Sequence, residues 1–328
     1  MGDLLTDVAM QAFAPATAAF VLAAIGLNYH FGLTGLLNMG QAGFMLLGMY
    51  GFAISIREGL PLWLAVLVAM GAAVLFGLLL GWPTLRLRGD YLAIVTIAAA
   101  EILRYGMRSQ TFVSVTGGAV GVPGNLFKWA FENLSPFPSQ RVTIWIFTMH
   151  GTKSTSWWLV VVAWTLVALL SLMFWRLSKS PWGRVLKGIR EDEDAVRALG
   201  KNVFSFKMQA LVIGGVIAAA GGLIYALPSA VSPGDYVTSL TFFIWTALLL
   251  GGAATIFGPV LGAVLYWVVF TFLGNLLPAL VDSGILPFIS NIQAATLRYI
   301  LVGIALMLLV IFRPQGILGN KKELTFVR

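Results

Sequence analysis

Side chains that could bind a metal or act as nucleophiles are few and far apart. The 328-residue chain has no cysteine and two histidines, His30 and His150. A zinc or haem site built from His and Cys needs several such ligands close together. Neither histidine has a carboxylate close to it in the sequence. We therefore predict no catalytic residue and no metal site, and we interpret both histidines as structural or solvated.

The sequence also lacks a nucleotide-binding loop. A P-loop reads Gly-x-x-x-x-Gly-Lys-Ser/Thr, whereas Gly200-Lys201 is followed by Asn202 and has no glycine at the earlier position. We therefore expect no cofactor in this chain and no binding of ATP by this chain alone.

Polar residues inside apolar segments are the next candidates, because such residues are costly in a membrane and often functional. Glu101 lies in the apolar run 94–104, and Arg104 follows three residues later on the same helical face. A local ion pair near the membrane boundary accounts for both residues. The alternative is that Glu101 lies on a translocation pathway or at a contact between helices.

Asn28, Asn38 and Gln41 form a second polar group around the glycine-rich stretch 32–43. The glycines allow close helix approach or a broken helix, and close packing alone would explain them. Amide side chains are not needed merely to fill space between helices. We therefore predict that Asn38 and Gln41 line or border a pathway.

A glycine-rich loop, 116–124, follows the apolar run that contains Glu101. Its composition predicts irregular structure. It is either a plain connection or an element that caps the outer mouth of a pathway and meets a delivering protein. In the second case Thr116, Gly117 and Gly118 belong to the pathway.

The densest run of charge lies at residues 176–207, which hold 12 of the 34 charged residues. Pro181 and Gly183 indicate a turn, residues 189–199 a short helix, and Gly200 the end of that helix. So short a helix is marginal in water by itself, and we expect it to pack against a partner. The alternative is a solvated connecting loop.

Composition places all these residues in a membrane protein. Hydrophobic residues make up 59% of the chain and charged residues 10%, against about 25% charged residues in soluble domains. This excludes a water-soluble enzyme. A spanning helix needs about 20 apolar residues, so we predict an all-α protein with eight or nine spans, of which 239–256 is the weakest and could be re-entrant. The candidate segments are 9–28, 37–56, 61–82, 91–107, 157–175, 208–227, 239–256, 258–281 and 294–312.

The basic residues predict the orientation, because Lys and Arg accumulate on the cytoplasmic side. Of the 21 basic residues, 14 lie in the loop 83–90, the segment 176–207 and the tail after 312. We place these inside and the loop 108–156 outside, so that the N-terminus is outside and the C-terminus cytoplasmic. The net charge of +8 is then an orientation signal, and nucleic acid is not expected as a partner. We expect a single membrane domain over 1–328, with no cleavable signal peptide.

Several blocks together resemble the permease family of branched-chain amino acid ABC importers. The segment 194–200 has the spacing of the Glu-Ala-Ala-x-x-x-Gly loop of ABC importer permeases, with Asp194 in place of Glu. Asn38 and Gln41 stand where relatives often carry Ser and His. The blocks run in the family's order along nearly the whole chain, at 32–43, 85–97, 100–104, 116–118, 188–200, 250–263 and 312–318.

The resemblance implies a non-enzymatic permease in the bacterial inner membrane. Its implied partners are a second related permease, two ATPase subunits that bind ATP and magnesium, and an extracytoplasmic binding protein. The short cytoplasmic helix is expected to dock on an ATPase and to transmit its movement. The expected coupling residues are Ile189, Arg190, Glu191, Asp192, Glu193, Asp194, Ala195, Arg197 and Gly200.

Two questions stay open at this point. The substrate is leucine, isoleucine or valine by family default, but similar sequences also carry other neutral amino acids, short amides or urea. The competing classes are an ion-coupled secondary transporter, which should carry several acids within its spans, and an intramembrane enzyme, which should carry converging acids or metal ligands. Only Glu101 lies clearly within a predicted span.

Overall fold

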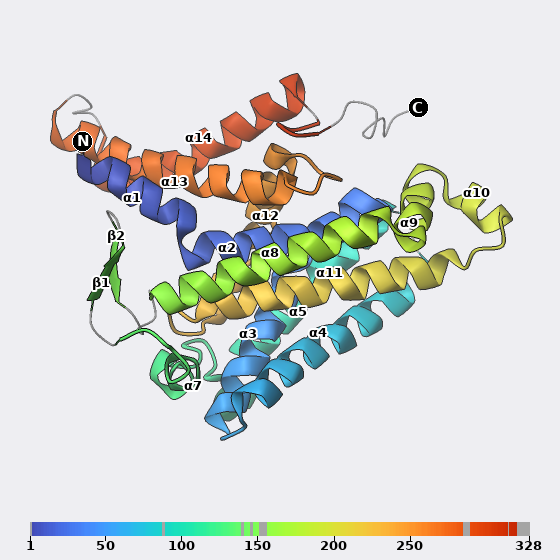
Figure 1. The fold of residues 1–328 in the computed structure, drawn as a ribbon, viewed down its shortest axis with the longest axis horizontal. Coiled ribbons are helices and arrows are strands. Elements are labelled where there is room, and N and C mark those ends of the chain that lie inside the picture. The colour runs from blue at the N-terminus through green and yellow to red at the C-terminus, as the bar shows by residue number, and fades with distance from the viewer. Residues whose placement is uncertain are drawn as a thin grey trace.

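The computed structural model describes residues 2–86, 89–138, 141–144, 147–150, 156–284, 289–313 and 315–319. Within these residues, helices occur at all nine predicted segments (Figure 1). The helices are α1 (Gly2–Phe13), α2 (Pro15–Leu27), η1 (Asn28–Leu33), α3 (Gln41–Arg57), α4 (Leu62–Thr84), α5 (Gly89–Arg108), η2 (Gln110–Phe112), α6 (Val113–Thr116), η3 (Gly124–Leu126), α7 (Trp129–Glu132), α8 (Trp157–Lys179), α9 (Pro181–Glu191), α10 (Glu193–Ala198), α11 (Val203–Ala226), η4 (Pro233–Tyr236), α12 (Thr238–Gly251), α13 (Gly258–Asp282) and α14 (Asn291–Phe312).

Five stretches among the described residues are long and apolar enough to cross a membrane: α2 with η1, α4, α8, α11 and α13. The apolar helix α12 is shorter, with 14 residues, or about 21 Å at 1.5 Å per residue. It ends at Gly252, whose φ of +113° is unsuited to a continuing helix. The predicted weakness of 239–256 is thus confirmed, because the helix stops within that segment.

The predicted first span differs from the structure at its start. Residues 9–28 do not form one helix, because the chain bends at Ala14 between α1 and α2. Pro15 is the first residue of α2, and a proline cannot donate the backbone hydrogen bond that a continuous helix would need there. The helix also continues past the predicted end, as the π-helical turn η1 over Asn28–Leu33.

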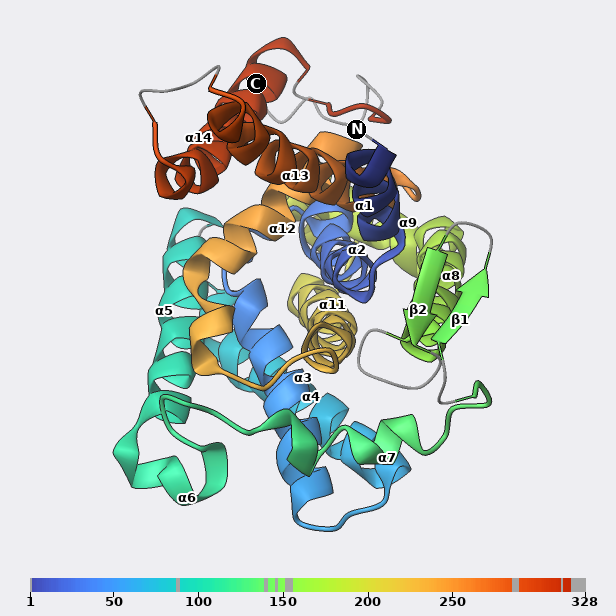
Figure 2. The same cartoon turned by 90° about the vertical axis from the view of Figure 1, so that its left-hand side faces the viewer.

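Helix α11 lies at the centre of the bundle, in contact with α2, α3 and α4 (Figure 2). Small residues allow this packing. A Cβ built on Gly48 of α3 would lie 2.1 Å from the carbonyl oxygen of Ala219 on α11, so only glycine permits this approach. Helix α2 is buried along nearly its whole length. Its position inside the bundle explains why it is apolar on all sides rather than on one stripe.

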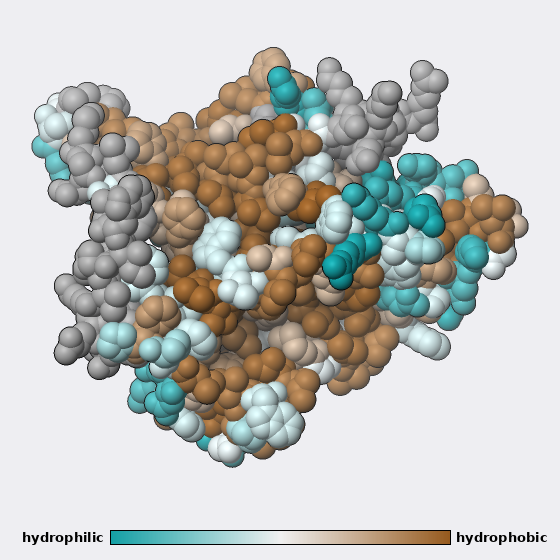
Figure 3. Space-filling model, viewed as in Figure 1, coloured by the Kyte–Doolittle hydropathy of each residue, from teal (hydrophilic) through white to brown (hydrophobic). Residues whose placement is uncertain are grey.

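Polar residues gather at the ends of the bundle, and the helical body between them is largely hydrophobic in the view of Figure 3. One end carries α9 and α10 (Figure 1). At the other end lie α7 and a small hairpin, in which β1 (Arg141–Ile144) pairs antiparallel with β2 (Phe147–His150). This hairpin is the one departure from the all-α prediction within the described residues. The basic residues Arg88, Lys153, Lys321, Lys322 and Arg328 lie outside those residues.

Candidate translocation and coupling sites

A buried polar cluster joins η1 to the start of α3. The Asn38 Nδ2 lies 3.0 Å from His30 Nδ1 and donates to Gln41 Oε1 at 2.9 Å. His30 Nε2 lies 3.0 Å from the carbonyl oxygen of Leu211 on α11. Because a carbonyl only accepts, Nε2 carries the proton and Nδ1 accepts from Asn38. The Gln41 amide donates in turn to the Ala23 carbonyl at 3.0 Å.

The side chains of His30, Asn38 and Gln41 are all completely buried within this subunit. The structural interpretation of His30 is therefore confirmed. Buried polar groups are costly unless they are hydrogen-bonded, and the amides of Asn38 and Gln41 have their partners here. A pathway role for Asn38 and Gln41 stays a prediction. His150 lies on β2, and nothing is described of its side chain.

Asn28, two residues before His30 on η1, holds the connection between α12 and α13. Its Nδ2 donates to the Thr255 carbonyl at 2.8 Å, and its Oδ1 accepts from the Ala254 backbone N–H at 2.8 Å. Ala254 has a φ of +66°, which is unusual for a residue with a Cβ. Asn28 therefore ties the start of η1 to the α12–α13 connection, although 226 residues separate Asn28 from Ala254 in the sequence.

The Glu101–Arg104 ion pair is confirmed, with 2.6 Å between Arg104 Nη2 and Glu101 Oε2. The other carboxylate oxygen of Glu101 accepts from the backbone N–H of Thr238 at 3.2 Å and from the Thr238 hydroxyl at 2.5 Å. Glu101 thus also caps the first turn of α12, where a negative charge is favourable. The expected contact between helices is present together with the local ion pair.

Helix α12 contacts two of the predicted pathway residues, Asn38 and Glu101. At its start Thr238 bonds to Glu101, and seven residues later the Trp245 indole donates to the Asn38 carbonyl at 3.1 Å. Between them the Thr241 hydroxyl accepts from the Ala42 backbone N–H at 3.0 Å. No pattern in the sequence indicates that 238–245 lies against both groups, because these contacts depend on tertiary packing.

The segment 116–118, which follows α5, forms a tight turn rather than an open loop. The Thr116 hydroxyl donates to the Met107 carbonyl at 2.8 Å, which ties the loop to α5. A Cβ on Gly117 would lie 1.9 Å from the carbonyl oxygen of Gly121. The structure therefore accounts for these residues through local folding, and a cap over a pathway stays a prediction.

Nearby, burial lowers the pKa of Lys128, whose ammonium donates to the Pro228 carbonyl at 3.0 Å.

The charged segment forms two short helices, so the prediction of one helix over 189–199 was wrong. Pro181 does not mark a turn but is the first residue of α9, which Ser180 caps. Asp192 then interrupts the helix, because its backbone is extended. Its carboxylate accepts hydrogen bonds from the backbone N–H groups of Asp194 and Ala195, both at 3.0 Å. Aspartate is a preferred N-cap residue. The predicted end at Gly200 is confirmed by its φ of +74°.

The predicted coupling residues divide into an inward and an outward group. Ile189 is buried, and Arg190 Nη1 donates to the Gly32 carbonyl of η1 at 2.5 Å. Glu191 and Asp192 at the end of α9 are exposed, as are most residues of α10. Arg197 pairs with Glu193 at 2.9 Å and with Asp194 at 2.7 Å, and Lys207 of α11 pairs with Glu193. Of the predicted coupling residues, those that are exposed are Glu191, Asp192, Asp194, Ala195, Arg197 and Gly200.

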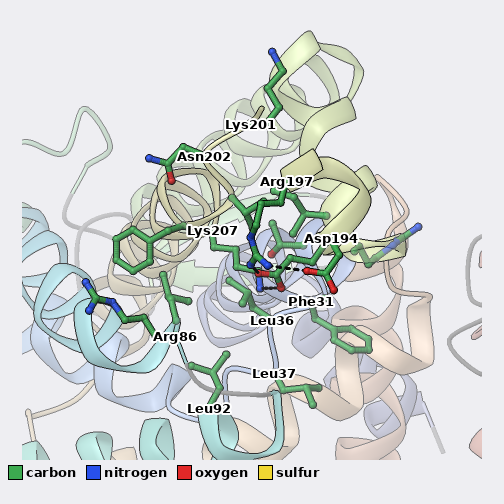
Figure 4. A pocket seen from close by; sticks show the side chains of 18 residues that line it. Phe31, Leu36, Leu37, Arg86, Leu92, Asp194, Arg197, Lys201, Asn202 and Lys207 are labelled. Atoms are coloured by element: carbon green, nitrogen blue, oxygen red, sulfur yellow. Dashed lines mark hydrogen bonds and ion pairs between the residues drawn. The ribbon is translucent and has the colours of Figure 1, made fainter. Parts of the chain in front are cut away.

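A cavity of about 1090 Å³ lies between these two helices, the start of α11, the end of α4 and the start of α5 (Figure 4). We name it the α9–α11 cavity. Its wall includes the backbone turn at Gly35, close to Gly32, together with apolar side chains from the 36–37 segment and α5. Among the described residues, three or more His, Cys, Asp or Glu side chains do not gather anywhere in an arrangement suited to a metal ion.

Comparison with known proteins agrees with this architecture. Residues 10–311 match the family model described as "Branched-chain amino acid transport system / permease component". The chain is 33% identical, over 92% of its length and 68% of the relative's, to the high-affinity branched-chain amino acid transport system permease protein LivM of Salmonella typhimurium. It is 26% identical, over 80% of its length and 69% of the relative's, to a LivM-type permease protein of Methanocaldococcus jannaschii.

A more distant likeness extends beyond amino acid transport. The chain is 23% identical, over 90% of its length and 89% of the relative's, to the nucleoside ABC transporter permease protein NupC of Lactococcus lactis. The family match covers nearly all of the bundle, including both groups of coupling residues and α12. The chain therefore belongs to the family of branched-chain amino acid transport permeases, and it is a membrane transport subunit of ABC type rather than an enzyme.

Proposed function

We propose that this chain, with a second related permease, forms the translocation pathway of an ATP-driven importer for branched-chain or other neutral amino acids. The observation that carries the proposal is the match of residues 10–311 to the permease family. In this proposal two ATPases bind ATP and magnesium on the cytoplasmic side, and an extracytoplasmic protein delivers the substrate. The N-terminus lies outside and the C-terminus in the cytoplasm of a bacterial cell.

Helices α9 and α10 are the proposed contact with the ATPase. Leu199, directly after α10, is 77% exposed, and an exposed leucine beside charged residues suits a protein interface. Arg190 supplies the link to the membrane domain, because it binds the Gly32 carbonyl. Gly32 in turn packs against Ala254, which Asn28 holds. A displacement of α9 would therefore reach the α12–α13 connection through packed groups.

The face formed by α5 and α12 is the proposed side of the pathway. Ile94, Ile102 and Tyr105 are 60–71% exposed on α5, and the side chain of Glu101 on the same helix is 25% exposed. A charged pair that faces acyl chains is costly. Contact with the second permease, or with the water of a pathway, would lower that cost.

Uptake measurements test the substrate. Deletion of the gene should abolish high-affinity uptake of radiolabelled leucine, isoleucine or valine, and the plasmid-borne gene should restore it. Urea and acetamide serve as the alternative substrates. Loss of urea or acetamide uptake with leucine, isoleucine and valine uptake unchanged would reject the amino acid assignment. Alanine variants of Asn38, Gln41 and Glu101 that transport normally at limiting substrate would remove these residues from the pathway.

Charge reversal tests the coupling contact. In the assembled complex, Glu191→Lys with Asp194→Lys should lower substrate-stimulated ATPase activity by about tenfold, which corresponds to about 1.4 kcal/mol of lost interaction. Glu58→Lys, whose side chain is 61% exposed at the far end of α3, is the matched control. Unchanged stimulation in a complex that assembles normally would reject the contact.

A further inference from the structure

The segment 315–319, which follows α14, is hydrogen-bonded to the end of α12. The last carbonyls of a helix have no partner within that helix. Here the Leu250 carbonyl accepts from the backbone N–H of Ile317 at 3.0 Å. The Gly251 carbonyl accepts from the backbone N–H of Leu318, also at 3.0 Å. We name this segment the α12 strap, because it supplies the partners that α12 lacks at its end.

The strap approaches α12 through its backbone. Gly316 is buried with a φ of +74°, and an added Cβ would lie 2.4 Å from the carbonyl oxygen of Leu249. On the helix side, a Cβ on Gly252 would lie 2.7 Å from the nearest strap atom. The side chains of Ile317 and Leu318 are instead 47% and 46% exposed. The contact therefore depends on the two N–H groups more than on these side chains.

The connection that follows α12 is also bound by residues that lead to α9. Asn28 bonds the backbone of the 252–257 connection at two points. A Cβ on Gly32 would lie 2.7 Å from the Ala254 nitrogen, and the Gly32 carbonyl accepts from Arg190 of α9. The connection is thus linked to α9 through η1, while the helix end directly before it is linked to α14 through the strap.

A displacement that arrives from α9 therefore meets the last turn of α12. Helix ends open more easily than helix interiors, so an unsupported last turn would unravel and absorb the displacement. A last turn bonded to the strap stays helical, and α12 then moves as a whole. The rest of α12 bonds the Asn38 carbonyl through Trp245 and the Glu101 carboxylate through Thr238. The strap thus determines whether the displacement reaches these groups.

We propose that the α12 strap is a positioning element for coupling: it holds the last turn of α12, so that a movement of α9 displaces the whole helix together with α14. The inference rests on the proposed function, in which the ATPase moves α9. It also gives a role to two blocks of the sequence, 250–263 and 312–318, whose residues bond each other in this contact.

Proline substitutions test the strap, because proline has no backbone N–H to donate. In the complete transporter with its binding protein and leucine, Leu318→Pro should lower substrate-stimulated ATPase activity about fivefold, or about 1 kcal/mol, the net contribution of one hydrogen bond. The ATPase activity without leucine should not change, because the docking of α10 is unaltered. Leu318→Ala keeps the N–H and should leave both activities unchanged. Ile317→Pro and Ile317→Ala repeat the comparison for the other bond.

A distance measurement follows the movement itself. The chain has no cysteine, so cysteines that replace Phe242 on α12 and Phe257 in the connection, which are 50% and 67% exposed, can carry spin labels. With the strap unaltered, the distance between the labels should stay constant when ATP and vanadate are added. In the Leu318→Pro variant it should change by about 5 Å, the rise of one helical turn, as the last turn unravels.

Equal stimulation in the proline and alanine variants would overturn the proposal. An equal loss in both would also overturn it, and would assign the side chains of Ile317 and Leu318 to contact with a partner. If the proline variants do not assemble, a nucleotide-dependent distance in the protein with the unaltered strap would overturn it. Absence of leucine stimulation in the unaltered transporter would reject the proposed function, and the distance measurement, which needs no leucine, would still decide on the strap.

Discussion

At the scale of single residues, polar side chains in the membrane domain join helices to one another through hydrogen bonds. Asn28, Gln41 and Glu101 each bond a backbone group of another helix or connection. Inside a membrane there is no water to satisfy such groups, so an amide or carboxylate placed between helices specifies how they pack. The residues that sequence analysis selected for a pathway are thus also residues that hold the bundle together.

Asn28→Ala should destabilise the protein by about 2 kcal/mol, because it leaves the buried Ala254 N–H without its partner. Thermal unfolding of the purified protein in detergent measures the change. Ser178→Ala removes an exposed hydroxyl that bonds a backbone carbonyl, and it should leave the unfolding temperature nearly unchanged. An equal effect of the two substitutions would contradict the role of Asn28.

At the scale of elements, caps and small residues decide where helices stop and how closely they approach. The break at Asp192 divides the charged segment into α9, which packs on the membrane domain, and α10, which extends away from it (Figure 1). Each part has a different task in the proposed coupling. Helix α9 joins the spans through Arg190, and α10 presents exposed residues to a partner.

Asp192→Ala should destabilise α10 by about 1 kcal/mol, because the N-cap that receives two backbone N–H groups is lost. Amide hydrogen exchange over 193–198 should then become about fivefold faster. Asp194→Ala is the matched control on the same helix, since Asp194 accepts only from Arg197 at an exposed position. Similar exchange rates in the two variants would show that the cap does not hold α10.

Gly48→Ala should be strongly destabilising, by about 2 kcal/mol or more, because its Cβ would overlap the Ala219 carbonyl and force α3 away from α11. Gly71→Ala is the control: it lies in α4 with nothing within 4 Å of the added Cβ. It should stabilise its helix by up to about 1 kcal/mol, from propensity alone. Unfolding in detergent compares the two, and the prediction fails if they shift stability in the same direction.

At the scale of the whole molecule, charge and hydrophobicity are separated along the axis of the bundle. Helices α9 and α10 lie at one end, and α7 with the β1–β2 hairpin lies at the other (Figure 1). This separation is what a chain in an asymmetric membrane requires, because the two aqueous sides present different partners. The predicted orientation assigns the ATPase to the first end and the binding protein to the second.

An impermeant maleimide tests this orientation in intact cells. Single cysteines replace Leu199, after α10, and Leu134, in the outer loop, which are 77% and 57% exposed. We expect labelling of the second cysteine in intact cells and of the first only after the membrane is opened. Labelling of both from outside would show that the segment after α10 is not cytoplasmic.

The sequence by itself determined the membrane class and the helix at each of nine apolar segments, and its resemblance to a permease family indicated the transport family. The membrane class and the helices follow from local composition, since each apolar run must form a helix in lipid wherever its neighbours lie. The local pattern did not predict where a single residue interrupts a helix, as at Asp192 and at the bend before Pro15.

Only the tertiary structure decided which distant residues meet. The link from Arg190 to Gly32 spans 158 residues of sequence, and that from Asn28 to Ala254 spans 226. The α9–α11 cavity likewise draws its lining from three separate stretches of the chain, 31–37, 85–92 and 189–207. Such contacts depend on how closely glycine and small residues let helices pack, and this close packing is a property of two surfaces together. No single segment of the sequence contains it.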